Sequence, residues 1–244
     1  MPHTSPTLAP PTAVLFELSG GLVDFGARTL PVALQRLHPD VELPAGAHYP
    51  EQALSELLGR APQAQERQAL QQMLAAVADE HAELTPGAAP LLQQLQAQGT
   101  PCAWLDSLPA DASARLAEAL PAPLAAGSGR SARPWPAPDA CWQALSQLQV
   151  ERLDGCILVS GNPLLLRAGL NAGCWTIGLA ACGPLCGLAP ADWQALSDGE
   201  REHLRAQATL QLYRLGSHSV IDHLGEIGPS LADIGMRRRK GEKP

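Results

Sequence analysis

The residues in this chain that can do chemistry begin with an acid at the end of an apolar run. Residues 13–16 read AVLF, Glu17 follows, and a small-residue turn, Ser19-Gly20-Gly21, comes next. A hydrophobic run that ends in a carboxylate and a glycine turn is typical of a buried strand that carries an acid to the edge of a sheet. Ligands of open α/β sheets bind at that edge, so Glu17 is a candidate catalytic or binding residue. The same pattern also fits a plain strand and turn with a surface acid.

The elements that must position this acid alternate along the chain. Helical patterns separate apolar runs at 12–16, 102–105, 124–126, 156–159, 174–178 and 219–221. Such alternation predicts a parallel sheet with helices on both faces. A purely helical stretch, 28–84, interrupts it after the first run. We therefore predict a doubly wound, Rossmann-like α/β core with a small all-α cap inserted after the first strand.

Composition shifts give the predicted domain boundaries. The predicted segments are a disordered Pro-rich lead at 1–11, the core at 12–27 and 85–236, the cap at 28–84 and a basic tail at 237–244. One long helix is expected at about 190–215. Arg237 to Lys240 is expected to be solvated, with a binding patch as the alternative.

Composition and charge exclude several classes of function. The chain of 244 residues has a formal net charge of −7, which argues against general binding of nucleic acid or anionic membranes. It contains no apolar run of the ~20 residues that a membrane helix needs, so a cytoplasmic location is expected. The six cysteines form no CxxC pair and are expected to be buried free thiols. Four tryptophans (Trp104, Trp135, Trp142 and Trp175) are expected in the core, and His81, His218 and His223 are expected to be structural.

Six segments carry recognisable motif text. They are AVLFELSGGLVDFGAR, HAELTPGA where the cap returns to the core, ARPWP, GLNAGCWTIG, GPLCGL and SHSVID. Together they resemble the phosphonoacetaldehyde hydrolase (phosphonatase) family of the haloacid dehalogenase (HAD) superfamily, and the first is similar to the family's nucleophile motif. The resemblance covers nearly the whole chain and implies the same core-and-cap fold. Phosphonatases are homodimers joined largely through their caps, so the resemblance also implies a homodimer through the cap.

The departures from the family fall on the residues that its chemistry needs. In phosphonatases an Asp attacks phosphorus, Mg²⁺ neutralises phosphoryl charge, and a cap Lys forms a Schiff base with the aldehyde. Here the nucleophile position holds Glu17, whose extra methylene displaces the carboxylate. The metal loop, 159–163, reads VSGNP without a carboxylate, and the lysines of the chain are Lys240 and Lys243. We therefore predict a catalytically inactive protein that needs no cofactor.

The resemblance also places the other residues of the old phosphoryl site. Asp106 stands where a phosphate-holding Thr belongs, and Ser107 can replace that Thr through a shift of one residue. Arg133 matches the family's basic residue, and we predict that it forms an ion pair with Glu17 in the absence of metal and phosphate. The predicted ligand pocket comprises Ser19, Gly20, Gly21, Asp106, Ser107, Ser160 and Gly161.

Two functions remain open at the level of sequence. The first is a binding, scaffolding or regulatory role toward a small anionic ligand or a protein partner, with backbone N–H groups of the Gly20-Gly21 turn available to an anion. The second is a divergent HAD hydrolase that acts on a small phosphate ester or phosphonate. It would use Glu17 as nucleophile or base, with Arg133, Ser160 and Mg²⁺.

Overall fold

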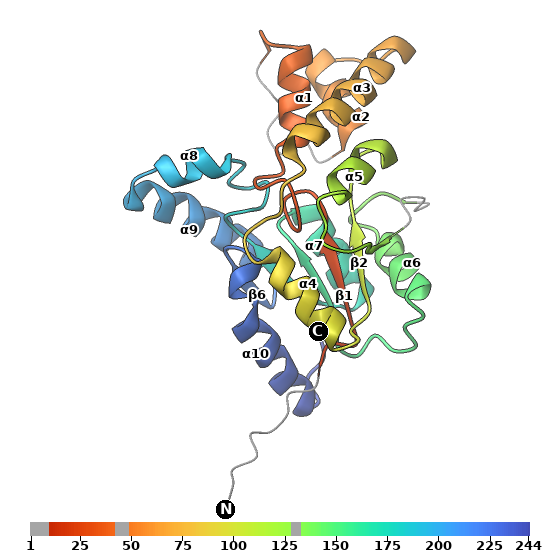
Figure 1. Ribbon diagram of the computed structural model, residues 1–244, viewed down its shortest axis with the longest axis vertical. Coiled ribbons are helices and arrows are strands. Elements are labelled where there is room, and N and C mark those ends of the chain that lie inside the picture. The colour runs from red at the N-terminus through yellow and green to blue at the C-terminus, as the bar shows by residue number, and fades with distance from the viewer. Residues whose placement is uncertain (1–9, 42–48, 128–132) are drawn as a thin grey trace, which may run out of the picture.

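A single parallel sheet forms the centre of the molecule. The computed structural model describes residues 10–41, 49–127 and 133–244. The sheet has six strands in the order β3-β2-β1-β4-β5-β6, and every strand pair is parallel (Figure 1). The strands are β1 Ala13–Glu17, β2 Cys102–Leu105, β3 Ala125–Ala126, β4 Cys156–Ser160, β5 Trp175–Leu179 and β6 Ser219–Ile221. The predicted α/β fold class is confirmed.

The central strand β1 is buried on both faces because its side chains alternate between two cores. Val14 and Phe16 pack into a large cluster that includes residues of the cap, whereas Ala13 and Leu15 pack into a second cluster. Helices α4 Ala88–Ala97, α5 Ala110–Ala117 and α10 Ile227–Arg239 contribute to the first cluster, and α6 Asp139–Gln147 and α7 Pro163–Ala172 to the second. Helices therefore cover both faces of the sheet, as a doubly wound fold requires.

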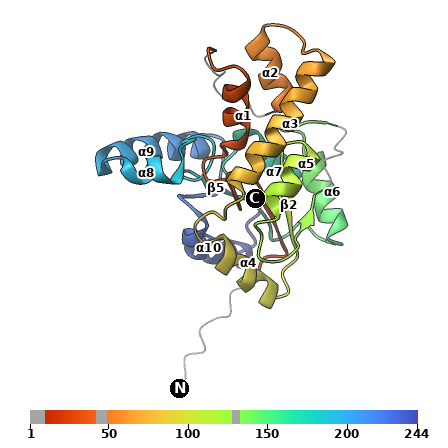
Figure 2. The same cartoon turned by 45° about the horizontal axis from the view of Figure 1, so that its top comes forward.

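The cap consists of three helices inserted between β1 and α4. They are α1 Thr29–Leu37, α2 Pro50–Leu58 and α3 Ala64–His81. Figures 1 and 2 show them stacked beyond the carboxyl end of β1, with the end of α3 beside α5 of the core. An isolated antiparallel bridge between Val23 and Leu84 joins the two segments that connect cap and core.

The carboxyl-terminal part of the chain differs from the sequence prediction in two places. The helix expected at about 190–215 is two helices, α8 Pro190–Ala195 and α9 Asp198–Arg214, because Ser197 caps the second one. The basic end is only partly a solvated tail: α10 follows a short 3-10 turn, Leu224–Glu226, and continues to Arg239, with Arg237 and Arg238 partly buried and Arg239 and Lys240 exposed. The Arg237 guanidinium lies 4.7 Å from the centre of the Trp175 ring, which favours this helical end through a cation–π contact.

The predictions about individual buried side chains are confirmed only in part, because Cys102, Cys186 and Trp104 are half-buried. All six cysteines are free, and four of them are buried. Trp135 and Trp175 are buried, but Trp142 is 47% exposed, because it lies on the outer side of α6 with its indole N–H donated to the Ala172 carbonyl. Among the described residues, no helix is long and apolar enough to cross a membrane.

Candidate functional site

Glu17 ends β1 with its side chain turned toward the adjacent strand β4. Its exposed fraction is only 4%. Three donors converge on Oε2: the Ser160 hydroxyl at 2.8 Å, the Gly161 N–H at 2.8 Å and the Asn162 N–H at 3.1 Å. The β4–α7 turn thus binds a carboxylate that belongs to the protein itself. Backbone N–H groups at the start of a helix are a common binding site for anions.

The environment of Glu17 favours its protonated form. Burial raises the pKa of Glu17 to about 7; the hydrogen bonds from Ser160 and Gly161 oppose that rise, and the nearby Asp106 carboxylate adds to it. At neutral pH this carboxyl group is therefore divided between its charged and neutral forms. Such a group can exchange a proton. Its charged oxygen, however, accepts hydrogen bonds from Ser160, Gly161 and Asn162 and is not available to a ligand.

Asp106 follows β2 and is arranged in the same way. The N–H groups of Ser107 and Leu108 donate to its Oδ1 at 2.8 and 3.3 Å, and the Ser113 hydroxyl donates to Oδ2 at 3.0 Å. Burial raises the pKa of Asp106 to about 6, and these hydrogen bonds oppose the rise. A second turn at the carboxyl edge of the sheet therefore also binds an internal carboxylate.

The glycine turn after Glu17 offers fewer donors than the sequence predicts. Gly20 N–H donates to the Val23 carbonyl at 2.8 Å, and Gly21 N–H donates to the Leu18 carbonyl at 3.3 Å. The prediction that these N–H groups are presented to an anion is therefore wrong, because the turn uses them itself. A Cβ atom on Gly21 would lie 2.2 Å from the Glu17 carbonyl oxygen, so this close turn requires glycine.

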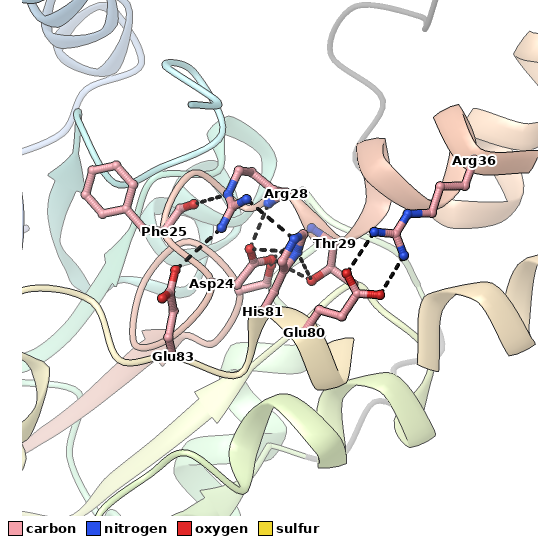
Figure 3. A network of polar contacts seen from close by, with 9 residues as sticks. Asp24, Phe25, Arg28, Thr29, Arg36, Glu80, His81 and Glu83 are labelled. Carbon is pink, nitrogen blue, oxygen red and sulfur yellow. Dashed lines mark hydrogen bonds and ion pairs between the residues drawn. The ribbon is translucent and has the colours of Figure 1, made fainter. Parts of the chain in front are cut away.

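A hydrogen-bond network around Asp24 spans the connection between cap and core (Figure 3), and Ser19 also belongs to it. Its hydroxyl donates to Asp24 Oδ2 at 2.7 Å, and the Thr29 hydroxyl and N–H donate to the same oxygen. His81 Nδ1 lies 3.5 Å from Asp24 Oδ1, and Arg28 donates to the Phe25 carbonyl. Asp24 is fully buried and organises the loop that connects cap and core.

Arg133 does not pair with Glu17. Its guanidinium forms a salt bridge with Asp139 at the start of α6, with 2.9 Å between Nη2 and Oδ2, and its side chain is 64% exposed. The predicted ion pair is therefore wrong, because Asp139 lies six residues away along the chain and Glu17 is already satisfied by the β4–α7 turn. The site thus contains Glu17, Ser160 and Gly161 together, with Asp106 and Ser107 on the neighbouring strand end.

Two further residues, which were not predicted from the sequence, shape the site. Asn162 donates its N–H to Glu17, and its side-chain oxygen accepts from Leu164 N–H at 2.9 Å as the N-cap of α7. Ser113 completes the shell of Asp106. An Asn before Pro163 is a recognisable helix start, so the cap of α7 could have been predicted. The contact of Ser113 depends on how α5 packs and has no signal in the sequence.

The residues around Glu17 do not suit Mg²⁺. This cation prefers several oxygen ligands in octahedral geometry. The β4–α7 turn instead directs two N–H groups and a hydroxyl hydrogen at Glu17 Oε2, and donors repel a cation. In the part of the chain that the structure describes, no group of three or more His, Cys, Asp or Glu side chains has the geometry to hold a metal ion.

Comparison with known proteins gives a consistent set of relatives, although no family model matches the chain. The phosphonoacetaldehyde hydrolase of Aeromonas hydrophila is 33% identical over 174 residues, which cover 67% of this chain but only 61% of that protein. The phosphonoacetaldehyde hydrolase of Paraburkholderia xenovorans is 25% identical over 269 residues, which cover 95% of this chain and 98% of that protein.

Solved structures of similar fold extend over the whole chain. One crystal structure is 48% identical with a TM-score of 0.73, and the match covers 96% of this chain and 99% of that one. A phosphonoacetaldehyde hydrolase-like protein from Oleispira antarctica is 24% identical with a TM-score of 0.85, covering 97% of each chain. A HAD-family hydrolase from Deinococcus radiodurans with bound phosphate and sodium shares the fold at 22% identity and a TM-score of 0.59, covering 93% of this chain and 98% of that one.

Proposed function

We propose that this chain, which belongs to the haloacid dehalogenase superfamily as a phosphonatase-like member, does not hydrolyse phosphoryl substrates and works as a binding, scaffolding or regulatory protein. The observation that carries the proposal is that two turns at the sheet edge donate their hydrogen bonds to carboxylates of the protein itself. The donors of the β4–α7 turn bind Glu17, and those of the turn after β2 bind Asp106. An incoming phosphoryl group would compete with both for its hydrogen bonds.

Electrostatics support the same proposal. A phosphoryl anion placed near Glu17 and Asp106 meets a like charge wherever these acids are ionised, and each such pair at 4 Å costs about 1 kcal/mol in water and about 4 kcal/mol near a protein surface. Neither Arg133, which pairs with Asp139, nor the two lysines at the end of the chain supply a compensating charge next to Glu17. A protein partner therefore fits the molecule better than a small anionic ligand. A homodimer through the cap and a cytoplasmic location are further parts of the proposal.

An assay of hydrolysis tests the proposal. The purified full chain is incubated with Mg²⁺ and a panel of phosphate esters and phosphonates, including phosphonoacetaldehyde, and the release of phosphate is measured. The Aeromonas enzyme serves as positive control, and Glu17→Gln and the exposed Glu118→Gln serve as variants. We expect the same background rate for wild type and both variants. Mg²⁺-dependent turnover that disappears only in Glu17→Gln would overturn the proposal.

One observation favours a second candidate, a divergent hydrolase. The pKa of Glu17 lies at about 7 and that of Asp106 at about 6, a range in which a carboxyl group can donate or accept a proton during a reaction. In this candidate Glu17 is nucleophile or base, and Mg²⁺ and phosphate bind to the folded protein. Thermal unfolding measured with and without millimolar Mg²⁺ and phosphate separates the two, because only the hydrolase is stabilised by them.

A further inference from the structure

The cap contacts the core at a place well separated in sequence from the two connecting segments. Tyr49 immediately precedes helix α2 of the cap, and Trp135 lies in the segment before α6, two residues after Arg133. The Trp135 N–H donates to the Tyr49 hydroxyl oxygen at 2.5 Å, and that hydroxyl donates to the Trp135 carbonyl at 3.5 Å. One side chain of the cap is thus bonded to both backbone groups of one core residue.

The Tyr49–Trp135 contact is both polar and apolar. The two ring centres are 5.8 Å apart with the planes tilted by 50°, a distance typical of stabilising aromatic pairs. Trp135 is 7% exposed and belongs to the core cluster on the α6–α7 face of the sheet, against which Tyr49 packs. Burial also raises the pKa of Tyr49 to about 12, so the hydroxyl keeps its proton and its donor role at physiological pH.

The other polar contacts of the cap with the core are of two kinds. At the connecting segments, the Thr29 hydroxyl donates to the buried Asp24 at 2.7 Å. Away from those segments, Arg115 of α5 pairs with Asp79 of α3 at 2.6 Å, but the two side chains are 39% and 51% exposed. A surface pair of this kind contributes little to stability. Of the contacts away from the connecting segments, Tyr49–Trp135 is therefore better placed to hold the cap against the core.

We propose that Tyr49 and Trp135 form a latch that holds the helical cap closed over the carboxyl ends of the central strands. Opening the cap breaks both hydrogen bonds and separates the two rings, whereas the linkers at Asp24 and His81 can act as the hinge. The closed cap shields the turns that bind Glu17 and Asp106, and it presents cap and core to a partner as one surface. The latch extends the proposed function but does not depend on it, because it makes no assumption about catalysis.

Hydrogen–deuterium exchange followed by mass spectrometry tests the latch. The chain contains two tyrosines, so Tyr49→Phe has a matched control in Tyr213→Phe on the exposed face of α9. Phenylalanine keeps the ring and removes only the hydroxyl. From the usual contribution of a hydrogen bond, we expect exchange in peptides covering residues 17–26 and 133–138 to accelerate about twofold to tenfold in Tyr49→Phe. Tyr213→Phe should exchange like wild type.

The result that would overturn the latch is wild-type exchange in both peptides of Tyr49→Phe. A second readout separates opening of the cap from general loosening of the fold. Peptides covering β5, which lies away from the cap–core contact, should keep their wild-type exchange in Tyr49→Phe. Equal acceleration in β5 would mean that the hydroxyl supports the whole fold rather than the closed cap, and it would also contradict the proposal.

Discussion

At the scale of single residues, the proposed loss of hydrolysis depends on the one methylene group by which Glu17 is longer than an Asp. The resemblance places Glu17 at the position of the family's Asp, and its Oε2 lies within 2.8 Å of both the Ser160 hydroxyl and the Gly161 N–H. The carboxylate is thereby held by β4 rather than presented to a substrate. Because a shift of ~1 Å in a reacting group can cost ~100-fold in rate, this placement alone opposes in-line attack.

The raised pKa of Glu17 predicts how stability depends on pH. The folded state binds the proton more tightly than the unfolded state, in which the ordinary pKa is 4.5, so Glu17 destabilises the fold as pH rises from about 4.5 to about 7. Glu17→Gln removes this titration. We expect its free energy of unfolding, relative to wild type, to rise across that interval by up to about 3 kcal/mol.

Urea denaturation at a series of pH values measures this difference. Glu118→Gln, an exposed substitution, is the control and should run parallel to wild type at every pH. A Glu17→Gln curve that is also parallel to wild type would show that Glu17 titrates normally in the folded protein.

The sequence identified the residues of the site better than it identified their contacts. Glu17 could be named because it follows an apolar run at the sheet edge, and Asp106 because the family resemblance places it where a phosphate-holding Thr belongs. Their hydrogen bonds could not, because the donors lie on turns that only the tertiary fold brings near. Arg133 shows the opposite case: its motif was recognisable, but the side chain turns to Asp139.

At the scale of elements, the β4–α7 turn depends on how helix α7 begins. Asn162 caps α7 through its side chain, and Pro163 occupies the first helical position with its φ angle already suited to the helix. Gly173 ends the helix in the left-handed conformation at φ 80°. These local signals were visible in the sequence and fix the position of the N–H groups that bind Glu17.

Removing the cap of α7 should therefore weaken both the helix and the site. We expect Asn162→Ala to lower the free energy of unfolding by about 1 kcal/mol, because the Leu164 N–H loses its acceptor. Asn162→Ser restores an oxygen at the same position and should recover most of that loss. Chemical denaturation of the three proteins checks this. Equal stability of Asn162→Ala and wild type would mean that the side chain does not cap the helix.

The boundaries of elements were predicted less well than their existence. The stretch expected as one helix at 190–215 contains the break at Ser197, where a hydroxyl accepts from Glu200 N–H as a capping box. The sequence contains both this capping box and a helical pattern that continues through it. Only the packed structure shows that the helix is broken at Ser197. The helical cap and the parallel sheet followed correctly from the alternation of apolar runs, since that pattern reflects burial directly.

At the scale of the whole molecule, the last helix contacts the segment that leads into β1. The Arg238 side chain is only 11% exposed and lies close to Asp154, with 3.3 Å between Nη2 and Oδ2. It also donates to the Pro10 carbonyl at 2.9 Å. The charge pattern of the last residues suggested a solvated tail, because a run of arginines does not reveal that one of them packs against a neighbouring loop.

Arg238 should therefore contribute to stability, whereas its neighbour should not. We expect Arg238→Ala to lower the free energy of unfolding by about 1–2 kcal/mol through lost packing and hydrogen bonds. Arg239→Ala removes the same charge from an exposed position and should stay within about 0.5 kcal/mol of wild type. Thermal or urea unfolding compares the two. Equal effects would assign the contribution to net charge rather than to the contacts of Arg238.

The measurement that tests the central claim most directly is calorimetric titration of inorganic phosphate into the full chain at pH 7.5, with and without Mg²⁺. If Glu17 and Asp106 occupy the donors of the old phosphoryl site, wild type should show no saturable heat in either condition. Saturable, Mg²⁺-dependent binding of phosphate that is lost in Glu17→Gln would contradict this account and favour an active hydrolase.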